Sequence, residues 1–198
     1  MDVREFFLYL HHATHFTGKA AWTLDAAMDA AMVPYYRTVL PGHNSVAWCL
    51  WHIARGEDWA IQTMLDGGEQ LLTRDDWDRR MGISYPGFGG GMGREEMIAL
   101  SEQIDLEALR EYYTAVAEAT QAYMRGFDFA TIEAPFDVQS RLALVPEAEG
   151  PSPLLHQLFR RWTTPLVWLE VFALLDVALH IEEADHVLNL VVPDREVV

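Results

Sequence analysis

The sequence has little cysteine and little positive charge, and both shortages exclude classes of protein. Cys49 is its only cysteine, which rules out an intrachain disulfide and a thiolate metal cluster. Its 14 lysines and arginines stand against 30 aspartates and glutamates, a formal net charge of −16. Nucleic acids and anionic membrane surfaces bind concentrated positive charge, so neither is an expected partner.

Long apolar runs are also missing. No uninterrupted apolar stretch approaches the roughly 18 residues of a membrane span. The run at residues 6–10 is shorter than the apolar region of a secretory signal, so we expect a cytoplasmic protein. Apolar residues nevertheless make up 51% of the chain, which fits a single domain over residues 1–198 with a sizeable core.

Four long segments show the apolar spacing of helices, and turn residues separate them. They cover about 3–31, 45–65, 94–125 and 165–192, with weak points at Gly18 and Ser101 and with Asn44 as the expected cap of the second. Between them lie a glycine-rich loop at 82–93 and a proline-rich connection at 126–164, which contains a short helix at about 154–161. This pattern predicts an all-α fold, a four-helix bundle with a long crossover connection.

Bundles build their sites from polar side chains on facing helices. On the last helix Glu182 and His186 share a face, and Leu175 and Leu179 mark that face as core-directed. On the second helix His52 lies on a face of apolar and small residues. Two imidazoles and one carboxylate form a recurrent ligand set for zinc and other divalent metals.

Each of these residues also has an ordinary structural interpretation. A lone histidine on an apolar face is more often a core residue than a ligand. Glu182 can pair with an arginine, and His186 can fill a cavity. A divalent cation would offset the cost of burying Glu182. Spacing alone leaves the two interpretations equal.

At the segment HNSVAWCLWHIARGEDW and at the last helix, the sequence resembles the DinB-like family of four-helix-bundle metalloproteins. The resemblance covers nearly the whole chain and implies that His52 and His186 are ligands. Many members carry histidine where Glu182 stands, whereas the branch that includes mycothiol-dependent maleylpyruvate isomerase carries glutamate. The ligand set is similar to that branch, and this likeness does not extend to substrate or thiol cofactor.

Other residues are candidates for supporting roles. His11 and His15 share one face of the first helix, where a surface position or a contact with a metal-bound group is expected, since the family takes no ligand from this helix. Glu183 flanks the predicted ligands and is a candidate partner for them. Trp48 and Trp59 are candidate walls of an apolar substrate pocket.

The leading functional hypothesis is a metalloenzyme that acts on a small molecule. Zinc or nickel would activate water for hydrolysis, or a low-molecular-weight thiol for transfer or isomerisation. The alternatives are a stress-response module that binds a metal or small ligand without turnover, and a structural bundle whose polar cluster fixes helix register. A homodimer through an apolar helix face is compatible with all three.

Overall fold

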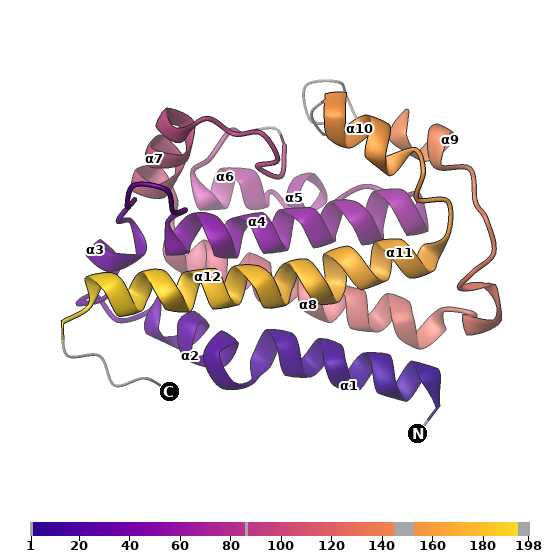
Figure 1. Ribbon diagram of the computed structural model, residues 1–198, viewed down its shortest axis with the longest axis horizontal. Coiled ribbons are helices and arrows are strands. Elements are labelled where there is room, and N and C mark those ends of the chain that lie inside the picture. Colours follow the sequence, from indigo (N-terminus) through magenta and orange to yellow (C-terminus); the bar gives the residue numbers. More distant parts are fainter. Residues whose placement is uncertain (1, 86, 145–152, 194–198) are drawn as a thin grey trace.

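The computed structural model describes residues 2–85, 87–144 and 153–193, and every regular element in them is a helix (Figure 1). Residue 86 of the predicted glycine-rich loop and residues 145–152 of the predicted proline-rich connection lie outside the described residues. In the described ranges no helix is both long enough and apolar enough to cross a bilayer.

Four long helical rods form the bundle. The first is α1 (Val3–Phe16) with α2 (Gly18–Ala26), the second α4 (Val46–Asp58) with the π-helix η1 (Trp59–Asp66), the third α8 (Leu106–Gly126), and the fourth α11 (Pro165–Glu170), the π-helix η3 (Val171–Leu175) and α12 (Asp176–Val191). Shorter elements connect them: α3 (Val33–Tyr36), α5 (Leu71–Arg74), α6 (Trp77–Met81), α7 (Arg94–Gln103), the 3-10 helix η2 (Phe129–Thr131), α9 (Val138–Leu142) and α10 (Pro153–Phe159).

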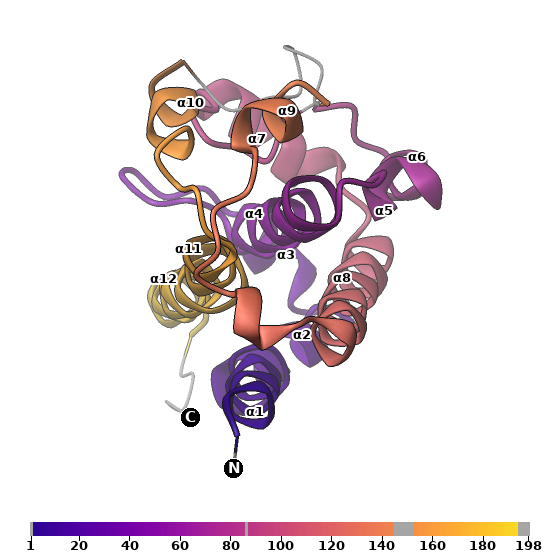
Figure 2. The ribbon, with the colours of Figure 1, turned by 90° about the vertical axis from the view of Figure 1, so that its right-hand side faces the viewer.

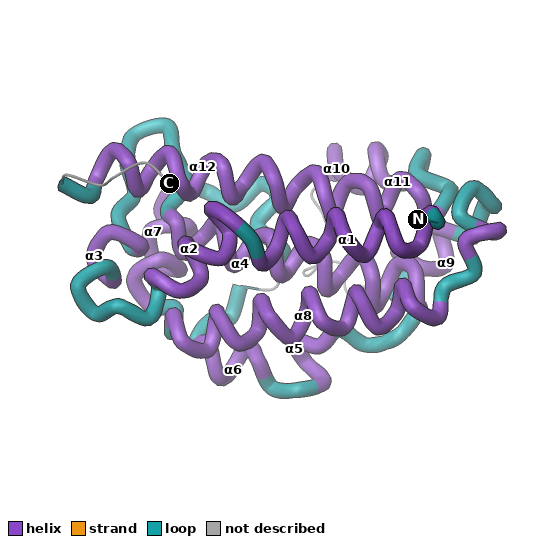
Figure 3. The backbone as a smooth tube through the Cα atoms, turned by 90° about the horizontal axis from the view of Figure 1, so that it is seen from below, coloured by secondary structure: helices purple, strands orange, loops and turns teal. Residues whose placement is uncertain are grey.

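The end view in Figure 2 shows α1, α4, α8 and α12 around one core, and Figure 3 shows α1 lying between α8 and α12. Arg4 at the start of α1 donates to the carbonyl of Phe127 just after α8, so these helices are antiparallel. Helices α4 and α8 run in the same direction, as Figure 1 shows, and residues 67–105 return the chain between them. The bundle thus has a long crossover, but at residues 67–105 and not in the long connection predicted at 126–164.

Helix α4 lies at the centre of the bundle. It packs on α8 and α12, and all its residues, Val46 to Asp58, are buried. Its N-cap is Ser45, whose hydroxyl accepts from Trp48 N at 2.9 Å, and not the predicted Asn44. Burial on every side forces its polar side chains to find partners on neighbouring helices.

Asp58, at the end of α4, is a buried polar residue with several hydrogen-bond partners on neighbouring elements. Its carboxylate accepts from the backbone N–H groups of Leu71 and Leu72, each at 2.9 Å, and from the Tyr112 hydroxyl at 2.7 Å. Burial raises the pKa of Asp58, and Arg55 opposes that shift. The carboxylate thus fixes the start of α5 and joins α4 to α8.

Candidate metal centre

Three potential metal ligands meet where α4 faces α12. Asp176 Oδ2 lies 3.5 Å from His52 Nε2, and Asp176 Oδ1 lies 3.6 Å from His180 Nε2. One ligand atom from each residue lies within 4.8 Å of the others. His52 is buried, whereas the side chains of Asp176 and His180 are 22% and 20% exposed, so the group opens to solvent on one side.

The other nitrogen of each imidazole is already engaged. His52 Nδ1 donates to the carbonyl of Phe88. His180 Nδ1 donates to Glu183 Oε2 at 2.8 Å, and the other oxygen of that carboxylate accepts from Asn44 N and Nδ2 at 3.2 and 3.0 Å. These bonds leave both Nε2 atoms free to face Asp176, the arrangement by which proteins orient metal-binding histidines.

Aromatic packing holds the rings in place. Trp48 stacks on His52 with ring centroids 4.5 Å apart and an angle of 10° between the planes. The same indole meets His180 edge to face at 5.7 Å. Gly56 allows the close approach of η3, because a Cβ there would lie 3.1 Å from the Phe172 ring and 3.8 Å from Asp176 Oδ2.

The protonation states suit cation binding. Burial lowers the pKa of His52, although Asp176 opposes the shift. The hydrogen bond from His180 lowers the pKa of Glu183 to about 2, with Asn44 contributing. Burial raises the pKa of Cys49, whose thiol lies beside His180 and Glu183, so it favours the protonated form. Neutral imidazole and ionised carboxylate are the forms that metals bind.

The spacing fits a divalent ion better than it fits direct hydrogen bonds. Separations of 3.5 and 3.6 Å between imidazole and carboxylate atoms exceed ordinary hydrogen-bond lengths. Two ligands about 2.05 Å from one tetrahedral ion lie about 3.3 Å apart. His52, Asp176 and His180 therefore form a group that could hold a metal ion.

The structure brings only His52 of the predicted ligand set into this group. Glu182 is exposed, and its carboxylate pairs with Lys19 Nζ at 2.6 Å. His186 is also exposed, with its ring 5.4 Å from that of His43. The structure thus does not bring the predicted His52, Glu182 and His186 together, and the group that it forms at His52 contains Asp176 and His180 instead.

The prediction differs from the structure because it took the wrong face of the last helix as the one directed toward the core. Leu175 and Leu179 were taken to mark the core, yet they are 51% and 61% exposed. The buried apolar residues of α12 are Val177, Ile181, Ala184, Val187 and Leu188. They follow a helical repeat visible in the sequence, which places Asp176 and His180 toward α4.

The candidates for supporting roles are also located. Glu183 and Trp48 contact the group directly, as described above. Trp59 does not touch it: this fully buried ring packs on Phe88 and Phe172, with centroids 5.2 and 5.7 Å away, and so supports the backbone that receives His52.

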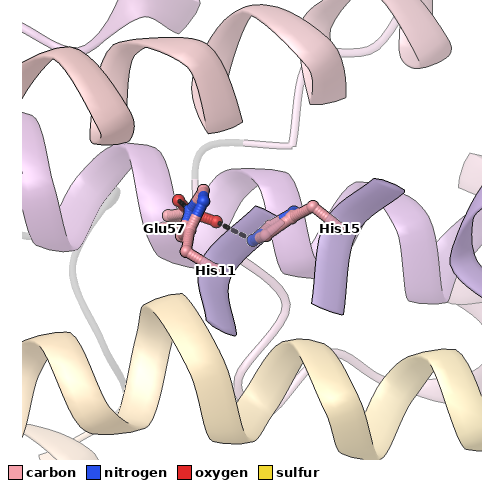
Figure 4. A group of neighbouring side chains, drawn as sticks. All are labelled: His11, His15 and Glu57. Carbon is pink, nitrogen blue, oxygen red and sulfur yellow. Dashed lines mark hydrogen bonds and ion pairs between the residues drawn. The ribbon is translucent and has the colours of Figure 1, made fainter. Parts of the chain in front are cut away.

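His11 and His15 are not surface residues. They are 0% and 1% exposed and turn from α1 toward Glu57 of α4 (Figure 4). Burial would raise the pKa of Glu57, but the two imidazoles lower it below its ordinary value. Burial lowers the pKa of His15, and Glu57 opposes that shift. Glu57 had no place in the sequence-based prediction.

Comparisons with known proteins concern the same region. A family model described as the DinB superfamily matches residues 22–177, which include His52 and Asp176 and stop short of His180. The chain is similar to the protein in "Crystal structure of the conserved protein of locus from Enterococcus faecalis", with a TM-score of 0.67 and 20% identity. That likeness covers 97% of this chain and 98% of the other, and shows a shared fold. No curated protein matches.

Proposed function

The chain belongs to the DinB superfamily. From that premise we propose that it is a divalent-metal-dependent enzyme that acts on a small molecule, and that His52, Asp176 and His180 are the ligands of its metal ion. The observation that carries the proposal is the engagement of both Nδ1 atoms, by Phe88 and Glu183, which leaves both Nε2 atoms facing one carboxylate. A chance pairing of buried polar residues does not require this orientation.

The chemistry of the donor atoms limits which metals would bind and which reactions they would support. Imidazole nitrogen with one carboxylate suits zinc or nickel. Such an ion, when bound, lowers the pKa of water or of an external thiol, which supports hydrolysis or thiol-dependent transfer and isomerisation. At Asp176 and His180, as at Glu182 and His186, a carboxylate residue stands four positions before a histidine.

The remaining residues shape the reaction space. Glu183 holds His180 in one tautomer, and the Phe88 carbonyl does the same for His52. Trp48 covers the His52 ring and limits the approach of water from that side. The exposed edges of Asp176 and His180 are the route by which a small molecule reaches the ligands.

Metal content tests the site. Protein purified without an affinity tag is assayed by mass spectrometry as wild type and as His52→Ala, Asp176→Ala and His180→Ala. Glu182→Ala and His186→Ala serve as matched controls, because they remove the same chemical groups from the same helix. Loss of one metal equivalent in the first three and none in the controls is expected. Unchanged metal content in folded His52→Ala or His180→Ala would overturn the assignment.

Turnover tests the enzyme claim separately. Metal-loaded wild type is screened against esters, amides, lactones and electrophiles with a low-molecular-weight thiol, beside the His180→Ala variant. Activity that requires His180 is expected. If metal binds at this site but neither protein turns over any substrate, the proposal of an enzyme is contradicted and the protein is a non-catalytic metal-binding module.

A further inference from the structure

We propose that His11, His15 and Glu57 form a second divalent-cation site, between α1 and α4 and separate from the group at His52. It has the same composition as the first, two imidazoles and one carboxylate, and again two of its members lie four residues apart on one helix. In the first group α4 supplies a histidine and α12 supplies the carboxylate and the other histidine. Here α1 supplies both histidines and α4 supplies the carboxylate. The inference does not depend on the proposed function.

The geometry brings all three donors to one point. Glu57 Oε1 lies 2.8 Å from His11 Nε2, and Glu57 Oε2 lies 3.0 Å from His15 Nε2. The imidazole rings lie side by side, with centroids 4.2 Å apart, and both turn the same nitrogen toward the carboxylate (Figure 4). Two ligands about 2.05 Å from one tetrahedral zinc lie about 3.3 Å apart, so each histidine and carboxylate atom would have to separate by roughly 0.3–0.5 Å to admit the ion.

One hydrogen bond, between His11 Nε2 and Glu57 Oε1 at 2.8 Å, leaves other polar atoms of the cluster unsatisfied. His15 Nε2 and Glu57 Oε2 are close, but neither has a hydrogen-bond partner of acceptable geometry in the part of the chain that the structure describes. The hydroxyl of Tyr113, whose ring lies 5.2 Å from that of His15, likewise has none among the described residues. Unsatisfied buried polar atoms are rare in folded proteins and call for a missing partner.

Charge identifies the kind of partner. Glu57 is 0% exposed, and the ion pairs found for it in the described ranges are with His11 and His15 alone. A single imidazolium would balance the charge of Glu57, but two imidazolium rings 4.2 Å apart would repel each other, so the cluster holds at most one full positive charge of its own. A divalent cation bound by neutral rings compensates Glu57 and gives the free donor atoms a ligand role.

The donor atoms of this site are buried, so the experiment has to supply the metal while the protein folds. With its donors buried, an ion enters when the protein folds or when α1 opens, because binding and folding are coupled at such sites. The full chain carrying His52→Ala and His180→Ala, which lacks the first site, is unfolded with chelator, refolded with or without zinc, and freed of loose metal. Zinc content and melting temperature are then measured.

The expected result is about one zinc per chain in this double variant, together with a higher melting temperature than its zinc-free form. Adding Glu57→Gln, which keeps the shape and removes the charge, should lower zinc content at least tenfold and abolish the temperature shift. Adding Glu182→Gln, a matched exposed change, should leave both unaltered. If Glu57→Gln does not fold, His15→Gln provides the same comparison.

Two outcomes would overturn the proposal. One is a folded double variant that neither retains zinc nor melts higher with it. The other is zinc that persists unchanged when Glu57→Gln or His15→Gln is added. Failure of the first site gives a different signature, namely equal zinc content in wild type and the double variant.

Discussion

His52 and Glu57 lie five residues apart on α4 and point to different helices: His52 Nε2 faces Asp176 Oδ2 of α12 at 3.5 Å, and Glu57 Oε1 faces His11 Nε2 of α1 at 2.8 Å. Both side chains are buried because α4 is enclosed on every side. One helix thereby supplies a donor to each of two polar groups. Ordinary core packing would place apolar residues at both positions.

Glu183→Gln should weaken metal binding without removing a ligand. The amide keeps the size of the side chain but loses the charge that orients His180 Nδ1. Loss of such a partner costs about 10-fold to 100-fold in metal affinity. Competition with a coloured chelator measures the change, with Glu182→Gln as the control on the exposed face. Equal affinities in the two variants would show that Glu183 does not orient the ligand.

Gly89→Ala should destabilise the protein more than Gly42→Ala. Both glycines have positive φ angles, +97° and +79°, so alanine is strained at each by about 1–2 kcal/mol. Only at Gly89 would the new Cβ lie 2.9 Å from the Trp48 and Trp51 rings. Overpacking adds about 1–3 kcal/mol.

Urea unfolding of both variants measures this difference. Since Gly89 follows Phe88, whose carbonyl accepts from His52, its variant should also bind metal more weakly. Matching unfolding free energies for Gly89→Ala and Gly42→Ala would argue against the close contact.

Asp58→Ala should be among the most destabilising single changes on α4. It removes the acceptor of two backbone N–H groups and of the Tyr112 hydroxyl, and leaves Arg55 without its nearby carboxylate, 3.8 Å away. A loss of about 3–5 kcal/mol is expected. Tyr112→Phe, which deletes one of these donors, should cost about 1–2 kcal/mol. Chemical denaturation of both variants measures the two losses of unfolding free energy. A larger loss for Tyr112→Phe than for Asp58→Ala would contradict the prediction.

Lys19→Met should lower stability modestly at neutral pH, because its ion pair with Glu182 is exposed to solvent whereas its second partner, Asp185, is buried. Hydrogen bonds to these carboxylates raise the pKa of Lys19 in the folded protein. Its contribution is therefore complete below the ordinary lysine pKa and disappears as pH rises through the raised value. Melting curves of wild type and variant at pH ~8 and pH ~11.5 should converge at the higher pH. A gap that widens would contradict this pairing.

The long helices could be predicted from sequence because each repeats its apolar spacing over several turns. The break at Gly18 and the two-helix division near Ser101 also follow from local residues. The short helices α3, α5, α6 and α9 have four or five residues each, too few for a periodic signal. Burial of all faces of α4 depends on tertiary packing, which the pattern of one helix does not reveal.

The candidate metal centre was predictable in part. His52 stood out as a histidine among apolar residues, and that expectation agrees with its place in the group. Asp176 and His180 were missed because exposed leucines were read as core, whereas surface apolar residues are common. Glu57 sits in the charged run at the end of a helix, where solvent exposure is the usual expectation.

The pairing of α4 with α12 at His52 and Asp176 also sets an order of events during synthesis. The ribosome adds about 5–20 residues per second, so the 128 residues from His52 to His180 take on the order of 10 s to make. Until residue 176 is added, the nascent chain carries one imidazole of the centre and neither of its partners. His11, His15 and Glu57, by contrast, have all been synthesised before residue 58, so a growing chain can meet a cation at its first hairpin well before the other centre exists.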